Sequence, residues 1–291
     1  MVRIISRGER TVDMIINFLL ILITIIMLYP FVYVTAMSFS SERAIALYEV
    51  WLWPVEFNIE NFILFYERSV INIFRAYWNS ILYAALTVVG SVIFCTLTAY
   101  PLIKKDLVFR KAIVMFIMIP MLFGGTFIQD FILYSQLGII NTKWAIVLPA
   151  IMSTWRIIII VTFFASTISV SLRESALIDG ASEFRILLFI YVPLSKPIIA
   201  IVALFAFVSQ WNNYFAPFLY LHDINLYTLP LVLQRAIEYQ EPLFAGEMLT
   251  EPFRQGMQSA AMVVSFVPIL LIYPFMQRYF VQGVQIGSIK G

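Results

Sequence analysis

The hydrophobic positions of this chain gather in six long runs that are almost free of charge. They cover residues 14–41, 76–103, 112–129, 144–172, 197–222 and 255–277. Each run is close to or longer than the roughly 20 residues that a helix needs to cross about 30 Å of hydrocarbon. Because lipid offers no partner to the backbone groups of an open sheet, the spans are expected to be helical. The pattern predicts an all-α membrane protein with six transmembrane helices.

Composition and charge agree with this interpretation and give the chain an orientation. Of the 291 residues, 62% are hydrophobic and only 12% are charged, which excludes an ordinary soluble domain. Lys and Arg concentrate in cytoplasmic loops, and an inside N-terminus places twelve of them inside and six outside. The inside set is Arg3, Arg7, Arg10, Lys104, Lys105, Arg110, Lys111, Arg173, Arg185, Lys196, Arg278 and Lys290. Both termini are therefore predicted to be cytoplasmic.

Several kinds of function are disfavoured by what the chain lacks. The net charge of +2 is explained by topology, so nucleic-acid binding is not expected. Cys95 is the single cysteine and lies in a span, which rules out an intrachain disulfide and disfavours a metal site. No Gly-Lys dipeptide occurs, so the chain has no P-loop for ATP. His222 is the only histidine, and no catalytic set forms around it, so we do not expect an enzyme.

A polar island at residues 174–197 separates two of the apolar runs. Ser171 or Ser182 can cap a helix start, and Gly180 ends the first short helix. A second helix over 181–191 would place four apolar side chains on one face, namely Phe184, Leu187, Leu188 and Tyr191. Proline residues at 193 and 197 would end this helix. An apolar stripe just outside the bilayer requires a protein partner at the membrane surface.

The spacing of Glu174, Ala176, Gly180, Ile190 and Pro193 resembles the EAA loop of ABC importer permeases. Ser175 and Val192 depart from the family pattern, which has Ala and Leu there. The resemblance implies a coupling helix that docks into a cleft on a cytoplasmic ATPase subunit. The residues that it assigns to this coupling are Glu174, Ala176, Asp179, Gly180, Ala181, Phe184 and Pro193. An ordinary helical hairpin between spans is the alternative.

Three further stretches resemble the carbohydrate branch of these permeases, of the maltose-permease type. They are Asn79-Ser80 near the start of the second span, Leu137–Thr142, and Trp211–Tyr214. The resemblance covers residues from about 75 onward and implies the type I importer fold. It divides the chain into an N-terminal helix and first outer segment, 1–75, and a permease core, 76–291.

The resemblance also implies a complex in the cell inner membrane. Its expected partners are a second permease subunit in a heterodimer, two ATPase subunits that hold ATP and Mg, and an extracytoplasmic solute-binding protein. The chain itself is expected to bind no cofactor. The outer loop at 223–254 would meet the binding protein, and the tail at 284–291 would touch the ATPase dimer. Trp51 and Trp53, in the first outer segment, either anchor at the interface or contact an outer partner.

Arg156 is the one charge inside a predicted span, with Trp155 beside it. It lies thirteen residues from Lys143, about 20 Å along a continuous helix, near the bilayer midplane. A charge at that depth is costly unless it faces a partner or a water-filled cavity, which favours a place in a substrate pathway. A structural pair with a carboxylate is the alternative. No Asp or Glu lies deep in another span, so such a carboxylate would come from another subunit.

Gln210, Trp211, Asn212, Asn213 and Tyr214 form a second candidate part of the pathway. If 197–222 is one helix, Gln210 lies at the same depth as Arg156. Amides can bind hydroxyl groups in both directions, and aromatic rings cover the apolar faces of sugars. The alternative is hydrogen bonding between helices by these amides.

The substrate hypothesis is an acidic oligosaccharide, because a cation at 156 suits a carboxylated sugar. Alginate-type oligouronides are the leading example, since the sequence also resembles the sugar-permease branch that contains alginate importers. An importer for a neutral oligosaccharide and a secondary transporter or channel both stay open. A membrane-embedded glycan enzyme is disfavoured, because no acid, base or metal groups cluster in the sequence.

Overall fold

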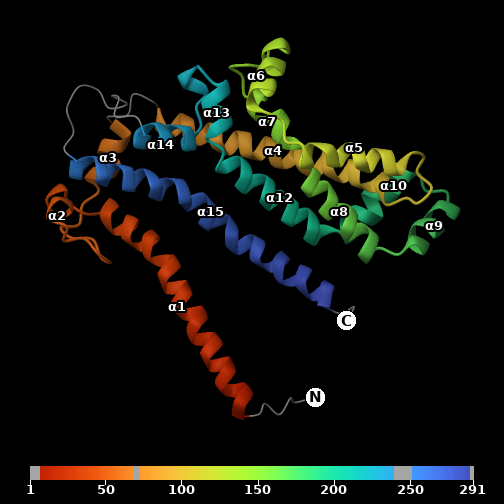
Figure 1. The fold of residues 1–291 in the computed structure, drawn as a ribbon, viewed down its shortest axis with the longest axis horizontal. Coiled ribbons are helices and arrows are strands. Elements are labelled where there is room, and N and C mark those ends of the chain that lie inside the picture. The colour runs from red at the N-terminus through yellow and green to blue at the C-terminus, as the bar shows by residue number, and fades with distance from the viewer. Residues whose placement is uncertain (1–6, 68–71, 239–250, 289–291) are drawn as a thin grey trace. The chain divides into compact units, whose positions relative to one another are not determined.

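The computed structural model describes residues 7–67, 72–238 and 251–288, and over these ranges the chain forms helices and no strands (Figure 1). The described chain divides into two compact units. One contains residues 1–70 and 235–267, and the other contains residues 71–234 and 268–291. The predicted division at residue 75 stays a prediction.

The first unit is built on α1 (Arg7–Ser38) and the beginning of α15 (Glu251–Ser288). Two short helices, α2 (Glu42–Ala46) and α3 (Glu60–Glu67), follow α1. The buried amide of Asn61 joins these pieces by donating to the carbonyls of Ser38 and Ser40 at 3.1 and 2.9 Å. Gly256 lets α15 approach, because a Cβ there would lie 2.5 Å from Asn61 Oδ1. Trp51 and Trp53 are both exposed, as either interpretation of this segment requires.

The second unit is organised around α4 (Ile73–Leu102), which packs along α12 (Lys196–Trp211) and against α7 (Trp144–Ile151) and α8 (Thr154–Thr167) (Figure 1). The reason for the close packing is visible in the small and hydroxylated residues that α4 buries, such as Gly90, Ser91 and Ala99. A Cβ at Gly90 would lie 2.6 Å from Ile151 Cδ1, so any larger residue would force the Ile151 side chain or α7 to shift.

Among the described residues, four helical stretches are long and apolar enough to cross a membrane. The number reaches the predicted six if each of two bent helix pairs is one span. In one pair, α5 (Arg110–Leu122) and α6 (Phe127–Gln136) meet at 114°. This bend falls at Gly124 and Gly125, where the absence of side chains permits a sharp change of direction. In the other pair, the bend of 84° lies at Ser195, before α12.

Two predicted spans contain backbone breaks that hydropathy does not reveal. The run 144–172 is interrupted at Met152 and Ser153, which are extended, so the distance along one continuous helix to Arg156 is wrong. The run 197–222 ends its main helix at Trp211 and resumes in α13 (Phe215–Tyr220), so the depth inferred for Gln210 is wrong for the same reason. An apolar run shows that a segment is surrounded by lipid or apolar groups, but it does not show where its helix is interrupted.

The remaining elements either form the first half of the bent pair that continues into α12 or connect the spans. They are α9 (Val170–Ile178), α10 (Glu183–Ile186), the π-helical turn η1 (Leu187–Tyr191), α11 (Val192–Leu194), the 3₁₀ turn η2 (Ile224–Leu226) and α14 (Leu229–Glu238). Part of the predicted outer loop, 239–250, and the tail end, 289–291, lie outside the described residues, as do Arg3, Arg68 and Lys290 of the orientation argument. The orientation therefore stays a prediction.

Candidate functional site: a surface loop and two broken spans

Gly180 shapes the turn at the centre of the polar island. The amide of Ala181 donates to the carbonyl of Ala176 at 2.9 Å, and the amide of Gly180 donates to that of Leu177 at 3.0 Å. These two bonds close the end of α9 as a Schellman motif with Asp179 at the C-cap. Gly180 has φ +79°, a left-handed conformation that side chains disfavour. The glycine in the predicted motif is therefore required by the backbone.

Ser182 starts the second helix, as one of the two sequence alternatives proposes. Its hydroxyl accepts from the amide of Arg185 at 3.4 Å. Ser171 does not occupy the other cap, because Ser169 stands there, without a side-chain cap bond. The prediction that Pro193 ends the helix is wrong. Pro193 lies within the helical run Glu183–Leu194, directly after the π-helical turn, and the break follows at Ser195.

The predicted apolar face of this helix is wrong in its members. Leu187 and Tyr191 are buried in the unit's own core, whereas Phe184 and Leu188 are exposed. The members of each pair are four residues apart and share one side of the helix, and only the side of Leu187 and Tyr191 faces the core. The most exposed apolar residues of the loop are Ile178, Phe189 and Phe184, with 86%, 72% and 61% of their surface accessible.

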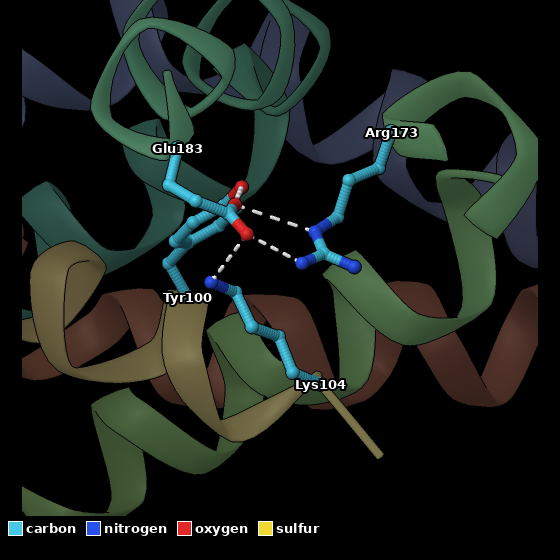
Figure 2. A network of polar contacts seen from close by, with 4 residues as sticks. All are labelled: Tyr100, Lys104, Arg173 and Glu183. Atoms are coloured by element: carbon cyan, nitrogen blue, oxygen red, sulfur yellow. Dashed lines mark hydrogen bonds and ion pairs between the residues drawn. The ribbon is translucent and has the colours of Figure 1, made fainter. Parts of the chain in front are cut away.

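A carboxylate that the sequence analysis overlooked ties this loop to the end of α4. Figure 2 shows Glu183 with three donors around it. Lys104 Nζ lies 2.8 Å from Oε1, Tyr100 donates its hydroxyl to Oε2, and the Arg173 guanidinium forms an ion pair with the same carboxylate. The hydrogen bond from Arg173 is the main reason that the pKa of Glu183 is lowered from 4.5 to about 2, and Lys104 and Tyr100 act in the same direction. Glu183 is thus charged throughout the physiological range.

The other predicted coupling residues lie on two different faces of the loop. Glu174 is exposed and lines a cavity of about 500 Å³ with Lys104 and Arg173. Ala176 and Ala181 pack partly buried against the core formed by α4, α8 and η1. The loop therefore has an inner face that belongs to this chain and an outer face of exposed charged and apolar side chains.

Arg156 fastens the break in the fourth span. Its guanidinium donates to the carbonyl of Ala150 at 2.9 Å and to the hydroxyl of Ser91, and only 8% of the residue is accessible. Ser91 in turn donates to the carbonyl of Ile151 at 2.5 Å. These bonds satisfy the last carbonyls of α7, and the cation complements the negative end of that helix. Among the described residues Arg156 has no carboxylate partner, so its charge is not neutralised there.

The run at 210–214 occupies the break in the fifth span and does not act as one group. Trp211 is buried between the rings of Tyr77 and Phe207, and Gln210 is buried with no described partner for its carbonyl oxygen. The amides of Asn212 and Asn213 bond to backbone near the helix ends, at Val208 O and Ala216 N. Tyr214 is exposed, as is Trp155, whose ring contacts Phe205 on α12 at 5.1 Å.

Two asparagines organise the opposite end of the second unit. Asn141, in the predicted turn and at φ +58°, accepts from the amides of His222 and Asp223 at 2.9 and 2.8 Å. Asn79 donates to the carbonyls of Asn225 and Tyr227 at 2.9 and 3.0 Å. In the sequence Asn79 is marked only by a resemblance, because the carbonyls that it binds lie far away along the chain.

Comparisons with known proteins place these features in a family. The family model described as "binding-protein-dependent transport system inner membrane component" matches residues 91–286. The polygalacturonan/rhamnogalacturonan transport system permease protein YtcP of Bacillus subtilis (strain 168) is 32% identical, over 97% of this chain and 99% of that protein. Protein LplC of the same organism is 36% identical, over 91% of this chain and 90% of LplC.

A solved structure is similar over almost the full chain. It is the crystal structure of a bacterial ABC transporter involved in the import of the acidic polysaccharide alginate. The TM-score is 0.84 at 28% identity, over 94% of this chain and 98% of the matched chain. The predicted helical permease fold and the resemblance to carbohydrate-type ABC permeases are confirmed. The chain belongs to the binding-protein-dependent transport system inner membrane components, the multi-pass permease subunits of ABC importers.

Proposed function

We propose that this chain is a permease subunit of an ATP-driven importer for acidic oligosaccharides, of which oligouronides are the leading example. The observation that carries the acidic substrate is the character of the relatives. One is named for polygalacturonan, a polymer of a carboxylated sugar, and one belongs to a transporter that imports alginate. Other relatives are named for neutral sugars such as lactose, which makes a neutral oligosaccharide the second candidate.

Arg156 supports the acidic substrate through its charge. One guanidinium nitrogen donates to the Ala150 carbonyl at the end of α7, and the other donates to Ser91, which itself bonds to the Ile151 carbonyl. We therefore infer that Arg156 acts on substrate through its electrostatic field more than by direct contact. A buried cation without a described carboxylate favours an anion nearby, because charges interact strongly where water is scarce. Trp155 and Tyr214 are the exposed aromatic rings of the predicted pathway and could stack on sugar faces.

The loop at 174–197 is proposed to dock on a cytoplasmic ATPase subunit. Its outer face offers Ile178 and Phe184, two exposed apolar side chains beside the exposed acids Glu174 and Asp179. An apolar anchor with a charged rim is the usual form of a protein interface. The complex would also contain a second permease, a second ATPase copy and an outer solute-binding protein, and ATP with Mg would bind only to the ATPase subunits.

Movement of the loop would be transmitted to the broken spans. The loop is continuous with α8 at one end and with α12 at the other, and both helices carry a break near their far ends. Non-helical backbone within a membrane is tolerated where it is enclosed by protein or lines a cavity. We infer that the two breaks border the passage and change its access from one side to the other during the ATPase cycle.

A competition experiment tests the substrate. Uptake of a labelled oligouronide by the reconstituted importer is measured against unlabelled acidic and neutral competitors, with Arg156→Gln and, as a matched control, Arg156→Lys. The Lys variant keeps the charge and is expected to keep the preference for acidic sugars. The Gln variant is expected to lose most of that preference. An unchanged preference in the Gln variant, with normal uptake, would contradict the role of this charge.

A further inference from the structure

We propose that Glu183 is a positioning residue that makes the inner end of α4 move as one body with the docking loop. This inference rests on the proposed function of the loop and goes beyond it, because it concerns a helix that is not connected to the loop in sequence. The residues that it joins are Tyr100 at the end of α4, Lys104 in the turn after it, and Arg173 on α9.

The geometry brings donors from two separate parts of the chain onto one carboxylate. Tyr100 and Lys104 belong to α4 and its following turn, where the amide of Lys104 bonds to the carbonyl of Pro101 at 3.1 Å. Arg173 comes from the first helix of the loop and Glu183 from the second (Figure 2). Without Glu183, Lys104 and Arg173 would present two cations to each other. One acid therefore holds three elements in a fixed arrangement.

The burial of these side chains makes the link firmer than an ordinary surface ion pair. The side chains of Lys104 and Arg173 are 18% and 15% accessible, and that of Glu183 is 38% accessible. Isolated exposed pairs contribute little, but a network with partly buried partners is screened less by water. The ammonium group of Lys104 also lies 5.1 Å from the centre of the Tyr100 ring.

A row of edge-on aromatic rings, which begins at Tyr100, extends the link to α8. The ring of Tyr100 meets the ring of Tyr191 edge-on at 5.0 Å, and Tyr191 meets Phe164 of α8 at 5.1 Å. Tyr191 belongs to the π-helical turn of the loop. The aromatic rings can slide past one another, whereas the ion pairs of Glu183 fix the relative position of the elements that they join. The positioning role therefore belongs to Glu183 and not to the rings.

The mechanical consequence follows from chain connectivity. The loop pulls α8 and α12 through covalent bonds, but α5 to α8 separate it from α4 in the sequence. Because α4 is the helix against which α7, α8 and α12 pack, a loop that moved without it would have to shear that packing. The Glu183 contacts let the loop carry α4 along.

Spin labels in the full importer complex test the rigid connection directly. The labels are attached at Lys105→Cys and Ser171→Cys, two exposed positions beside Lys104 and Arg173, in a Cys95→Ala background. The distance between the labels is expected to change by less than about 2 Å between the nucleotide-free and ATP-bound states. In Glu183→Gln the same distance is expected to broaden and shift between states. A large shift in the parent complex would overturn the proposal.

Transport gives the second readout. Glu183→Gln is expected to lower the sugar transported per ATP hydrolysed by about tenfold or more, while Lys105→Gln leaves it unchanged. The charge swap Arg173→Glu with Glu183→Arg keeps the ion pair within the loop but leaves Lys104 facing a cation, so it should not restore the lost coupling. A Glu183→Gln complex with the parent ratio of sugar to ATP would refute the role.

Two controls keep the outcomes distinct. If Glu183→Gln fails to assemble, Tyr100→Phe combined with Lys104→Gln removes only the α4 side of the link and is expected to uncouple in the same way. If the parent permease does not retain the ATPase on purification, the docking proposal itself fails. If it does retain the ATPase and the double variant transports normally, only the Glu183 proposal fails.

Discussion

Replacing Ser91 with alanine tests the account of the broken fourth span. In the structure the Ser91 hydroxyl has two tasks, since it donates to the carbonyl of Ile151 and accepts from the Arg156 guanidinium. Arg156 is buried and Ile151 is half-buried. The substitution removes a single oxygen from α4 and leaves its helix propensity unharmed. Any loss of stability then comes from the Ile151 carbonyl and the Arg156 guanidinium, each of which has lost a hydrogen-bond partner.

The expected magnitude follows from the cost of leaving buried polar groups without partners. Each such group costs about 1–3 kcal/mol, more when it is charged. Cys95 Sγ lies 3.6 Å from the Ile151 carbonyl and remains as a weak donor, while Arg156 keeps its bond to Ala150. We therefore expect a net loss of about 2–4 kcal/mol. At roughly 2–4 °C per kcal/mol, the melting midpoint should fall by roughly 4–16 °C.

The assay is thermal unfolding of the purified importer in detergent, followed by gel filtration of the protein that remains soluble. Thr98→Ala serves as the matched control, because Thr98 lies on the same helix and its exposed hydroxyl bonds only to the carbonyl of Phe94. The control should change stability by less than about 0.5 kcal/mol. Equal melting midpoints for Ser91→Ala and Thr98→Ala would refute the view that Ser91 and Arg156 fasten this break.

Four further substitutions probe other parts of the structure. A Cβ at Gly180 meets nothing within 4 Å, so Gly180→Val should uncouple uptake from ATP hydrolysis by backbone strain alone, whereas Gly180→Asn, which tolerates positive φ, should retain most coupled uptake. Gly90→Val should cost about 1–3 kcal/mol through its clash with Ile151, and adding Ile151→Ala should recover part of the loss in melting temperature. Asn79→Asp should destabilise more than Asn79→Ala in the same assay, because a carboxylate would face two carbonyls; the reverse order would contradict the described bonds. The pKa of Glu183 is lower in the folded protein, so its stabilisation is present above about pH 4.5 and is lost as the pH falls toward 2, and the melting difference between parent and Glu183→Gln should stay constant from about pH 6 to 8.

Much of the fold could be predicted from the sequence, because hydropathy directly reports which segments contact lipid. The runs at 76–103 and 14–41 correspond closely to α4 and α1. The turn at Gly180 was also predictable, since only a few residues accept its backbone conformation. The breaks at Met152 and Asn212 were not, because nothing in an apolar run of normal length marks where its hydrogen bonds stop.

The site was predicted in part, and the misses have a common cause. The coupling residues formed a local motif, whereas the contact between Tyr100 and Glu183 joins positions 83 residues apart. Spacing along the chain carries no signal for such a meeting. Arg156 stood out because a charge in a span is unusual, yet its bonds to Ser91 and Ala150 depend on a helix break that the sequence did not reveal.

The arrangement around Glu183 limits how this protein can change over time. A single mutation that neutralised the acid would leave Lys104 and Arg173 repelling each other, so the fitness of each position depends on the other two. We expect homologues without an acid at 183 to have also lost a cation at 104 or 173. Correlated substitutions at positions 104, 173 and 183 in many related sequences would therefore reveal a contact that a single sequence does not show.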